Sequence, residues 1–174
     1  QCVGLIGCGS IGSLVAKALQ QYDLDVYVYD PYLSDARADA LGAQRCSLEE
    51  LFERCSVVSN HLPNNAGTRG MLTYALFSKM LPYATFLNTG RGAQVVEDDL
   101  IAVLKAREDL TAVLDVTEPE PLPSDHILRH LRNVVLTPHV AGPAFGGAEE
   151  TERKIATICC DNIRRYASGW PLRN

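Results

Sequence analysis

The chain has 174 residues, of which 47% are hydrophobic and 21% charged, and its formal net charge is −5. This composition is typical of a globular domain that is long enough to bury one complete hydrophobic core. The acidic balance argues against a nucleic-acid partner, and the shortness of the apolar runs argues against a membrane-spanning segment.

Short apolar runs alternate with amphipathic stretches along the chain, a pattern typical of βαβ units. In chain order it predicts a strand at 2–6, a helix at 10–21, a strand at 25–29, helices at about 34–41 and 47–55, a strand at 56–60, a helix at 74–80, a strand at 84–88, a helix at 97–107, strands at 110–116 and 133–137, and a helix at about 148–167. The predicted fold class is α/β: a Rossmann-type doubly wound parallel sheet with helices on both faces.

Local signals refine three of these helices. In the helix at 47–55, Ser47 is a predicted N-cap and Glu50 completes a capping box. Gly169 is expected to end the last helix. The buried face of the first helix is expected to carry Ile11, Val15, Ala16 and Leu19.

The loops at 61–70, 117–125 and 138–147 are rich in Pro, Gly and Asn and follow strand ends. Ligands of open parallel sheets bind at this edge, so these loops are the first places to look for chemistry.

The six cysteines form no CxxC pair, and His and Cys do not cluster at zinc spacing, so no metal site is predicted. We expect free thiols, buried or half-buried in a reducing cytoplasm, at Cys2, Cys8, Cys46, Cys55, Cys159 and Cys160.

A dinucleotide site is predicted where the first strand meets the first helix. The segment there reads GCGSIG, and it contributes Gly7, Gly9, Ser10, Ile11 and Gly12. Its glycines allow a pyrophosphate to approach the backbone at a helix N-terminus. Asp30 ends the second strand, where a carboxylate accepts hydrogen bonds from ribose hydroxyls and repels a 2′-phosphate, which favours NAD over NADP. A methyltransferase that uses S-adenosylmethionine shares this pattern but leaves the second half of the chain unexplained.

Three later segments each follow a strand and carry one residue suited to catalysis. They are LNTGRG with Arg91, LDVTEPEP with Glu120, and TPHVAG with His139. Strand ends of a parallel sheet lie side by side, so these three side chains are expected to converge.

With these motifs in this order, the chain closely resembles the D-isomer-specific 2-hydroxyacid dehydrogenases over nearly its whole length. The resemblance implies hydride transfer between NAD(H) and a D-2-hydroxy acid or 2-keto acid. It implies that Arg91 binds the substrate carboxylate, where a planar guanidinium gives bidentate contact. It makes His139 the acid/base and Glu120 the carboxylate that orients it. Glu118, two residues earlier, is the less favoured candidate for that last role.

The resemblance also places other residues in the cofactor cleft. His61 is expected to have a structural or cofactor-contacting role rather than acid/base work, while His126 and His130 are expected to be solvated. Asp115 either meets the nicotinamide end or is a buried structural residue. The cofactor-binding residues expected besides the glycine segment and Asp30 are His61, Pro63, Thr68, Thr89, Arg91, Asp115, His139 and Gly142.

The resemblance implies two domains: an NAD-binding Rossmann domain at 1–147, and at 148–174 a crossover helix with the start of the return to a substrate domain that is mostly absent. The chain begins at Gln1 without a leader, like an excised segment, so we expect it to bind NAD but to turn over little keto acid. A homodimer through the cofactor domain is also implied. The identity of the acid stays open.

A second function class comes from residues 29–45, which are similar to the C-terminal-binding proteins, NAD-sensing corepressors that bind protein partners. Those proteins carry a Trp after the histidine segment, where this chain has Ala141 and Gly142. This difference favours the metabolic enzyme over the scaffold. A purely structural domain is disfavoured because Arg91, Glu120 and His139 are all present.

Overall fold

The computed structural model describes residues 1–142 and 147–173, with side chains described outside 147–151. They form two compact units, Gln1–Pro138 and His139–Asn174. Residues 143–146, in the loop predicted at 138–147, lie outside the described part. The predicted domain boundary at 147 therefore stays a prediction.

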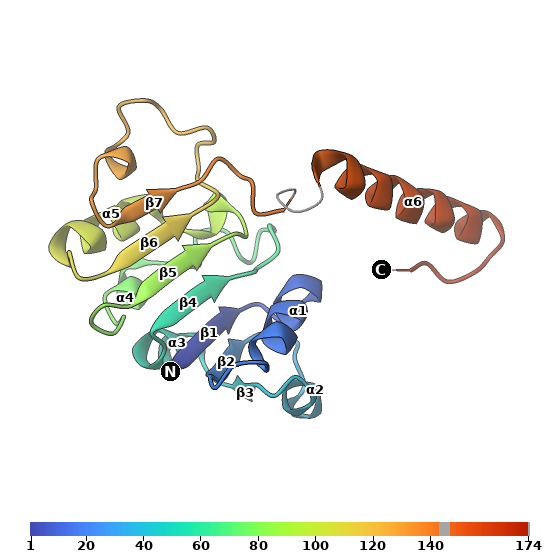
Figure 1. Ribbon diagram of the computed structural model, residues 1–174, viewed down its shortest axis with the longest axis horizontal. Coiled ribbons are helices and arrows are strands. Elements are labelled where there is room, and N and C mark those ends of the chain that lie inside the picture. Colours follow the sequence, from blue (N-terminus) through green and yellow to red (C-terminus); the bar gives the residue numbers. More distant parts are fainter. Residues whose placement is uncertain (143–146, 174) are drawn as a thin grey trace. The chain divides into compact units, whose positions relative to one another are not determined.

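The first unit is built on a parallel sheet, as the alternating pattern predicts (Figure 1). Its seven strands lie in the order β3-β2-β1-β4-β5-β6-β7. Strand order reverses between β1 and β4, which creates the crevice where ligands of such sheets bind. The strands are β1 (Cys2–Ile6), β2 (Asp25–Tyr29), β3 (Gln44–Arg45), β4 (Val57–Asn60), β5 (Thr85–Asn88), β6 (Thr111–Leu114) and β7 (Val134–Leu136).

The helices of this unit lie close to the predicted ranges. They are α1 (Ser10–Leu19), α2 (Asp35–Ala40), α3 (Leu48–Arg54), α4 (Tyr74–Phe77) and α5 (Glu97–Ala106), with 3-10 turns η1 (Gly92–Gln94) and η2 (Ile127–Arg129). The capping box of Ser47 and Glu50 is confirmed, with both of its hydrogen bonds formed. Periodicity does not predict β3, η1 or η2.

Two cores lie on opposite faces of the sheet, and β1 contributes to both. Val3 and Leu5 pack in the cluster that holds Ala16 of α1 and Ala38 of α2. An added Cβ at Gly4 would meet the Leu51 side chain of α3 at 2.6 Å, so this glycine allows α3 to pack closely on the other face. Helices α3, α4 and α5 supply side chains to that second core. Three phenylalanines pack against one another within it: Phe52 of α3, Phe77 of α4 and Phe86 of β5.

One expectation for α1 is wrong. Gly12 and Ala16 are buried on its inner face, but Ile11 is 62% exposed. Ile11 stands in the first turn, where the helix leaves the sheet edge, and it lines the pocket described below.

The second unit consists mainly of α6 (Gly147–Ala167), and Gly169 (φ +70°) follows its end as predicted. Cys159 and Cys160 are exposed on this helix, which corrects the expectation of burial; the other four thiols are buried or half-buried, and all six are free. Within the described residues, no helix is long and apolar enough to cross a bilayer.

Candidate dinucleotide pocket and active-site loops

The glycine segment forms a tight turn between β1 and α1. Gly7 adopts φ +89° and donates its N–H to Tyr29 O at 2.8 Å, which joins the turn to the end of β2. An added Cβ at Gly12 would lie 2.1 Å from Gly7 O, so this position needs glycine for the helix to pack on the turn. At Gly9, by contrast, an added Cβ would meet no described atom within 4 Å. Protein packing therefore does not explain Gly9, and its predicted role in letting a ligand approach the backbone stays a prediction.

Asp30 is fixed at the end of β2 by two backbone donors. Cys8 N–H donates to Oδ2 at 2.7 Å, and Tyr32 N–H donates to Oδ1 at 2.8 Å. Each carboxylate oxygen keeps capacity to accept another hydrogen bond, which suits the two hydroxyls of a ribose.

A pocket of about 890 Å³ runs along this edge of the sheet from Asp30 to Arg91. The predicted cofactor residues that line it are Gly7, Gly9, Ser10, Ile11, Asp30, His61, Pro63, Thr68, Thr89 and Arg91. The pocket thus joins the glycine turn to the loops that follow β4 and β5. Its volume and its position at the carboxyl ends of the strands match those of a cofactor cleft.

His61 lies in the wall of this pocket. Its Nε2 is 2.9 Å from the Ser59 hydroxyl, and burial lowers the pKa of the imidazole. A neutral ring at neutral pH agrees with the contact role expected for His61. Thr68 organises the same loop, since its hydroxyl donates to Pro63 O at 2.6 Å.

Arg91 stands at the other end of the pocket, on the loop after β5. Its side chain is exposed, and Nη1 donates to Gly90 O at 2.6 Å. The backbone of Arg91 is held on both sides: Asn88 Nδ2 donates to its carbonyl at 3.1 Å, and its N–H donates to Gln94 Oε1 at 3.0 Å.

The loop after β6, which carries Glu118 and Glu120, packs directly on the Arg91 loop. An added Cβ at Gly92 would lie 2.1 Å from the carbonyl carbon of Thr117. Glu118 forms an ion pair with Arg69 at 2.5 Å, so its carboxylate bridges this loop to the loop after β4. This ion pair holds Glu118 at the junction of the two loops, and the role of Glu120 stays a prediction.

Three predicted residues of the first unit fall outside the pocket lining. Gly12 acts through packing, as described above. Asp115 is buried and accepts a 2.5 Å hydrogen bond from the Thr137 hydroxyl, which supports the structural alternative for this residue. Glu120 lies in an exposed part of its loop.

His139 and Gly142 belong to the second unit, where His139 is exposed and adopts a left-handed backbone with φ +53°. Their roles stay predictions.

His126 is not solvated as expected. Its Nε2 lies 3.0 Å from Glu97 Oε1, and both side chains are mostly covered. Burial raises the pKa of Glu97, and the neighbouring imidazole opposes that rise. The pair anchors η2 to the start of α5. His130 is exposed, as expected.

Several pocket residues that come just after Asp30 were not predicted from the sequence. Tyr32 is 95% exposed and Arg37 donates Nη2 to the Ser13 hydroxyl at 3.2 Å; both line the pocket. Their position directly behind an acidic strand end is the signal that could have identified them. Among the described residues, no group of three or more His, Cys, Asp or Glu side chains could hold a metal.

A parallel sheet with a glycine turn, an acidic strand end and one pocket at the switch point defines a Rossmann-type dinucleotide-binding domain. The family model of the D-isomer-specific 2-hydroxyacid dehydrogenase NAD-binding domain matches residues 1–141. The chain belongs to this family, and its cofactor class is a nicotinamide dinucleotide.

Individual relatives agree with this assignment. D-3-phosphoglycerate dehydrogenase of Archaeoglobus fulgidus is 34% identical over 98% of this chain and 32% of its own length. The crystal structure of D-mandelate dehydrogenase from Rhodotorula graminis superimposes with a TM-score of 0.85 at 36% identity, covering 98% of this chain and 49% of that one. An NADPH-dependent glyoxylate/hydroxypyruvate reductase from Sinorhizobium meliloti, solved with NADP, gives 0.83 at 30% identity and covers 99% and 54%. The chain therefore spans about a third to a half of these proteins. All three are oxidoreductases, which favours the enzyme over the corepressor scaffold.

Proposed function

We propose that this chain is the cofactor-binding part of an NAD-dependent D-2-hydroxyacid dehydrogenase, acting in the cytoplasm on a small 2-hydroxy or 2-keto acid. The observation that carries the proposal is the continuous pocket that extends from Asp30 to Arg91. It combines a site for the adenosine half of a dinucleotide with a cation suited to a carboxylate substrate.

The proposed roles follow from side-chain chemistry. Bound NAD(H) supplies or accepts the hydride. Arg91 binds the substrate carboxylate through its guanidinium, and its exposure at the pocket end leaves it accessible for that contact. His139 gives a proton to the carbonyl oxygen in reduction and removes it from the hydroxyl in oxidation. Glu120 orients that imidazole and favours its protonated form. Gly142 is proposed for the same end of the site.

The preference for NAD over NADP rests on Asp30. Its carboxylate is fixed by two N–H donors in the pocket wall, so it does not swing away from a 2′-phosphate. Arg37 also lines the pocket, where its cation offsets part of this repulsion and its guanidinium donates to Ser13. Repulsion by Asp30 is nonetheless expected to decide the selectivity.

The test is to titrate the chain with NADH and with NADPH in separate experiments. Nicotinamide fluorescence measures the binding in each. We expect NADH to bind about tenfold tighter or more, which corresponds to roughly 1.4 kcal/mol. Asp30→Asn and Asp30→Ala should abolish this preference. Asp35→Asn is the matched control, because Asp35 pairs with Arg45 outside the pocket lining. Equal binding of both nucleotides by the wild type would contradict the assignment of NAD. Binding of neither would contradict the pocket itself.

In our proposal the protein also forms a homodimer through this domain, as the family resemblance implies. Sedimentation of the full-length protein tests this: a monomer at micromolar concentration would contradict it.

A further inference from the structure

Three buried amide side chains lie together between the loops after β4 and β5. Asn60, Asn88 and Gln94 are 0%, 1% and 0% exposed. Asn60 Nδ2 donates to Asn88 Oδ1 at 2.9 Å and to Gln94 Oε1 at 2.6 Å. We call these three residues the amide cluster. None of them was singled out as a site residue by its sequence pattern.

The cluster is fully hydrogen-bonded. Gln94 Nε2 donates to Leu62 O at 2.9 Å and to Pro63 O at 3.0 Å, and Asn60 Oδ1 accepts from Leu62 N–H at 3.2 Å. Among the described residues, no buried side-chain nitrogen or oxygen lacks a partner. A satisfied polar network of this kind fixes one geometry, because any shift leaves a buried polar group without its partner.

What the cluster holds is the backbone around Arg91. Asn88 Oδ1 accepts from Gly90 N–H at 3.1 Å, Gln94 Oε1 accepts from Arg91 N–H at 3.0 Å, and Asn88 Nδ2 donates to Arg91 O at 3.1 Å. A Cβ at Gly90 would lie 2.9 Å from both Asn60 Nδ2 and Gln94 Oε1, so the glycine before Arg91 lets the loop close on the amides. The exposed guanidinium has no comparable clamp of its own.

We infer that Gln94, acting with Asn60 and Asn88, is a positioning residue for Arg91: the cluster fixes the backbone of Arg91 against the Leu62–Pro63 pocket wall and so aims the guanidinium at the substrate carboxylate. This inference rests on the proposed function, which gives Arg91 that carboxylate. A misplacement of about 1 Å at a substrate-binding group can cost on the order of a hundredfold in rate.

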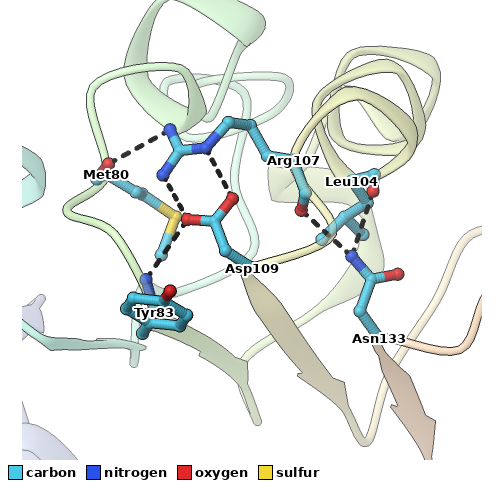
Figure 2. Close-up of polar contacts among 6 residues, drawn as sticks. All are labelled: Met80, Tyr83, Leu104, Arg107, Asp109 and Asn133. Carbon is cyan, nitrogen blue, oxygen red and sulfur yellow. Dashed lines mark hydrogen bonds and ion pairs between the residues drawn. The ribbon is translucent and has the colours of Figure 1, made fainter.

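The test compares Gln94→Met with Asn133→Ala in the full-length protein. Methionine keeps the volume of Gln94 but removes its four hydrogen bonds. Asn133 is the matched control, because its amide donates two hydrogen bonds, to Leu104 O and Arg107 O, at the opposite edge of the sheet (Figure 2). The substrate is whichever of glyoxylate, hydroxypyruvate and pyruvate the wild type reduces fastest, with NADH oxidation as the readout.

We expect Gln94→Met to lower kcat/KM roughly tenfold to a hundredfold, mainly through a higher KM for the keto acid. The Kd for NADH should change far less. Asn133→Ala should lower Tm without changing kcat/KM more than about twofold. In an Arg91→Ala background, Gln94→Met should have no further effect on kcat/KM, because the residue acts through Arg91.

The possible failures are distinguishable. If Arg91→Ala leaves turnover unchanged, or the wild type reduces none of the three acids, the proposed function fails and this inference with it. If Arg91→Ala lowers turnover but Gln94→Met lowers only Tm, as Asn133→Ala does, the inference alone is overturned. Should Gln94→Met not fold, Asn60→Leu decides the same question. It removes the donors that link Asn88 to Gln94, and it should again lower kcat/KM only when Arg91 is present.

Discussion

At the scale of single residues, the glycines of the first turn divide into two kinds. Gly12 is required by the protein itself, because a Cβ there would collide with Gly7 O. Gly9 has an ordinary extended backbone, φ −68° and ψ −153°, and open space where its Cβ would stand. The same motif thus contains one glycine that the fold requires and one that we expect the ligand to require.

This division predicts opposite effects of alanine. Gly9→Ala should leave the free energy of unfolding unchanged or raise it by up to about 1 kcal/mol, since alanine restricts the unfolded chain. It should weaken NADH binding about tenfold or more, because the methyl group enters the space of the pyrophosphate. Gly12→Ala should instead lower the free energy of unfolding by roughly 1–3 kcal/mol through overpacking. Urea unfolding and NADH titration of both variants provide the measurement. Unimpaired NADH binding by Gly9→Ala would refute the ligand explanation.

At the scale of elements, the loop after β6 carries two carboxylates, Glu118 and Glu120, and we propose Glu120 as the one that orients His139. Glu118 is committed to Arg69, an exposed pair of the kind that contributes about 0.2–1 kcal/mol. Glu118→Gln should therefore leave kcat within about twofold. Glu120→Gln should lower kcat about a hundredfold and change the pH profile of kcat/KM, because it removes the proposed partner of the proposed acid/base histidine. Steady-state rates from pH 5 to pH 9 test both variants. The reverse ranking would move the role to Glu118.

Periodicity predicted most elements because most helices and strands bury one face against the sheet. It missed β3 because both of its residues, Gln44 and Arg45, are exposed. It extended α4 to residue 80, whereas the helix ends at Phe77. The following turns are tighter, with Lys79 N–H donating to Leu76 O and Met80 N–H donating to Phe77 O. Apolar spacing does not distinguish these turns from a helix.

The pocket was predicted from strand-end motifs, but the amide cluster was not. Asn60 and Asn88 end their strands like loop residues, and three of the four hydrogen bonds of Gln94 reach partners 31 to 34 positions away in the chain. Hydrogen bonds over such separations leave no local pattern. The same limit explains Ile11: helical spacing placed it inside, whereas the pocket at the helix start exposes it.

At the scale of the whole first unit, the carboxyl ends and the amino ends of the strands carry different kinds of polar residues. The carboxyl ends of the strands carry the pocket. The opposite edge carries purely structural polar contacts around Arg107 and Asp109 (Figure 2). Arg107 donates to Asp109 through Nε at 2.8 Å and Nη2 at 2.7 Å, and Tyr83 N–H donates to the same carboxylate at 3.3 Å. Tyr83 has a left-handed backbone with φ +63°, so these contacts hold a turn that is unfavourable by itself.

The carboxylate of Asp109 at this edge predicts how the free energy of unfolding depends on pH. Hydrogen bonds from Arg107 and from Tyr83 N–H lower the pKa of Asp109 from about 3.8 to about 2. Because the folded state holds the proton less tightly than the unfolded chain, Asp109 contributes its full stabilisation above pH 3.8 and loses it as the pH falls towards 2. The wild type should therefore exceed Asp109→Asn in free energy of unfolding by a constant amount at neutral pH, and the difference should shrink through this acid window.

Urea unfolding of both proteins at closely spaced pH values gives that difference directly, since all other titrating groups cancel between them. Arg107→Gln should remove the same acid-dependent part, because the guanidinium supplies the main cause of the lowered pKa. Neither variant should alter NADH affinity, since both residues lie at the edge away from the pocket. A stability difference that stayed constant down to pH 2 would show that the carboxylate charge is not what stabilises this turn, leaving hydrogen-bond geometry alone as the contribution of Asp109.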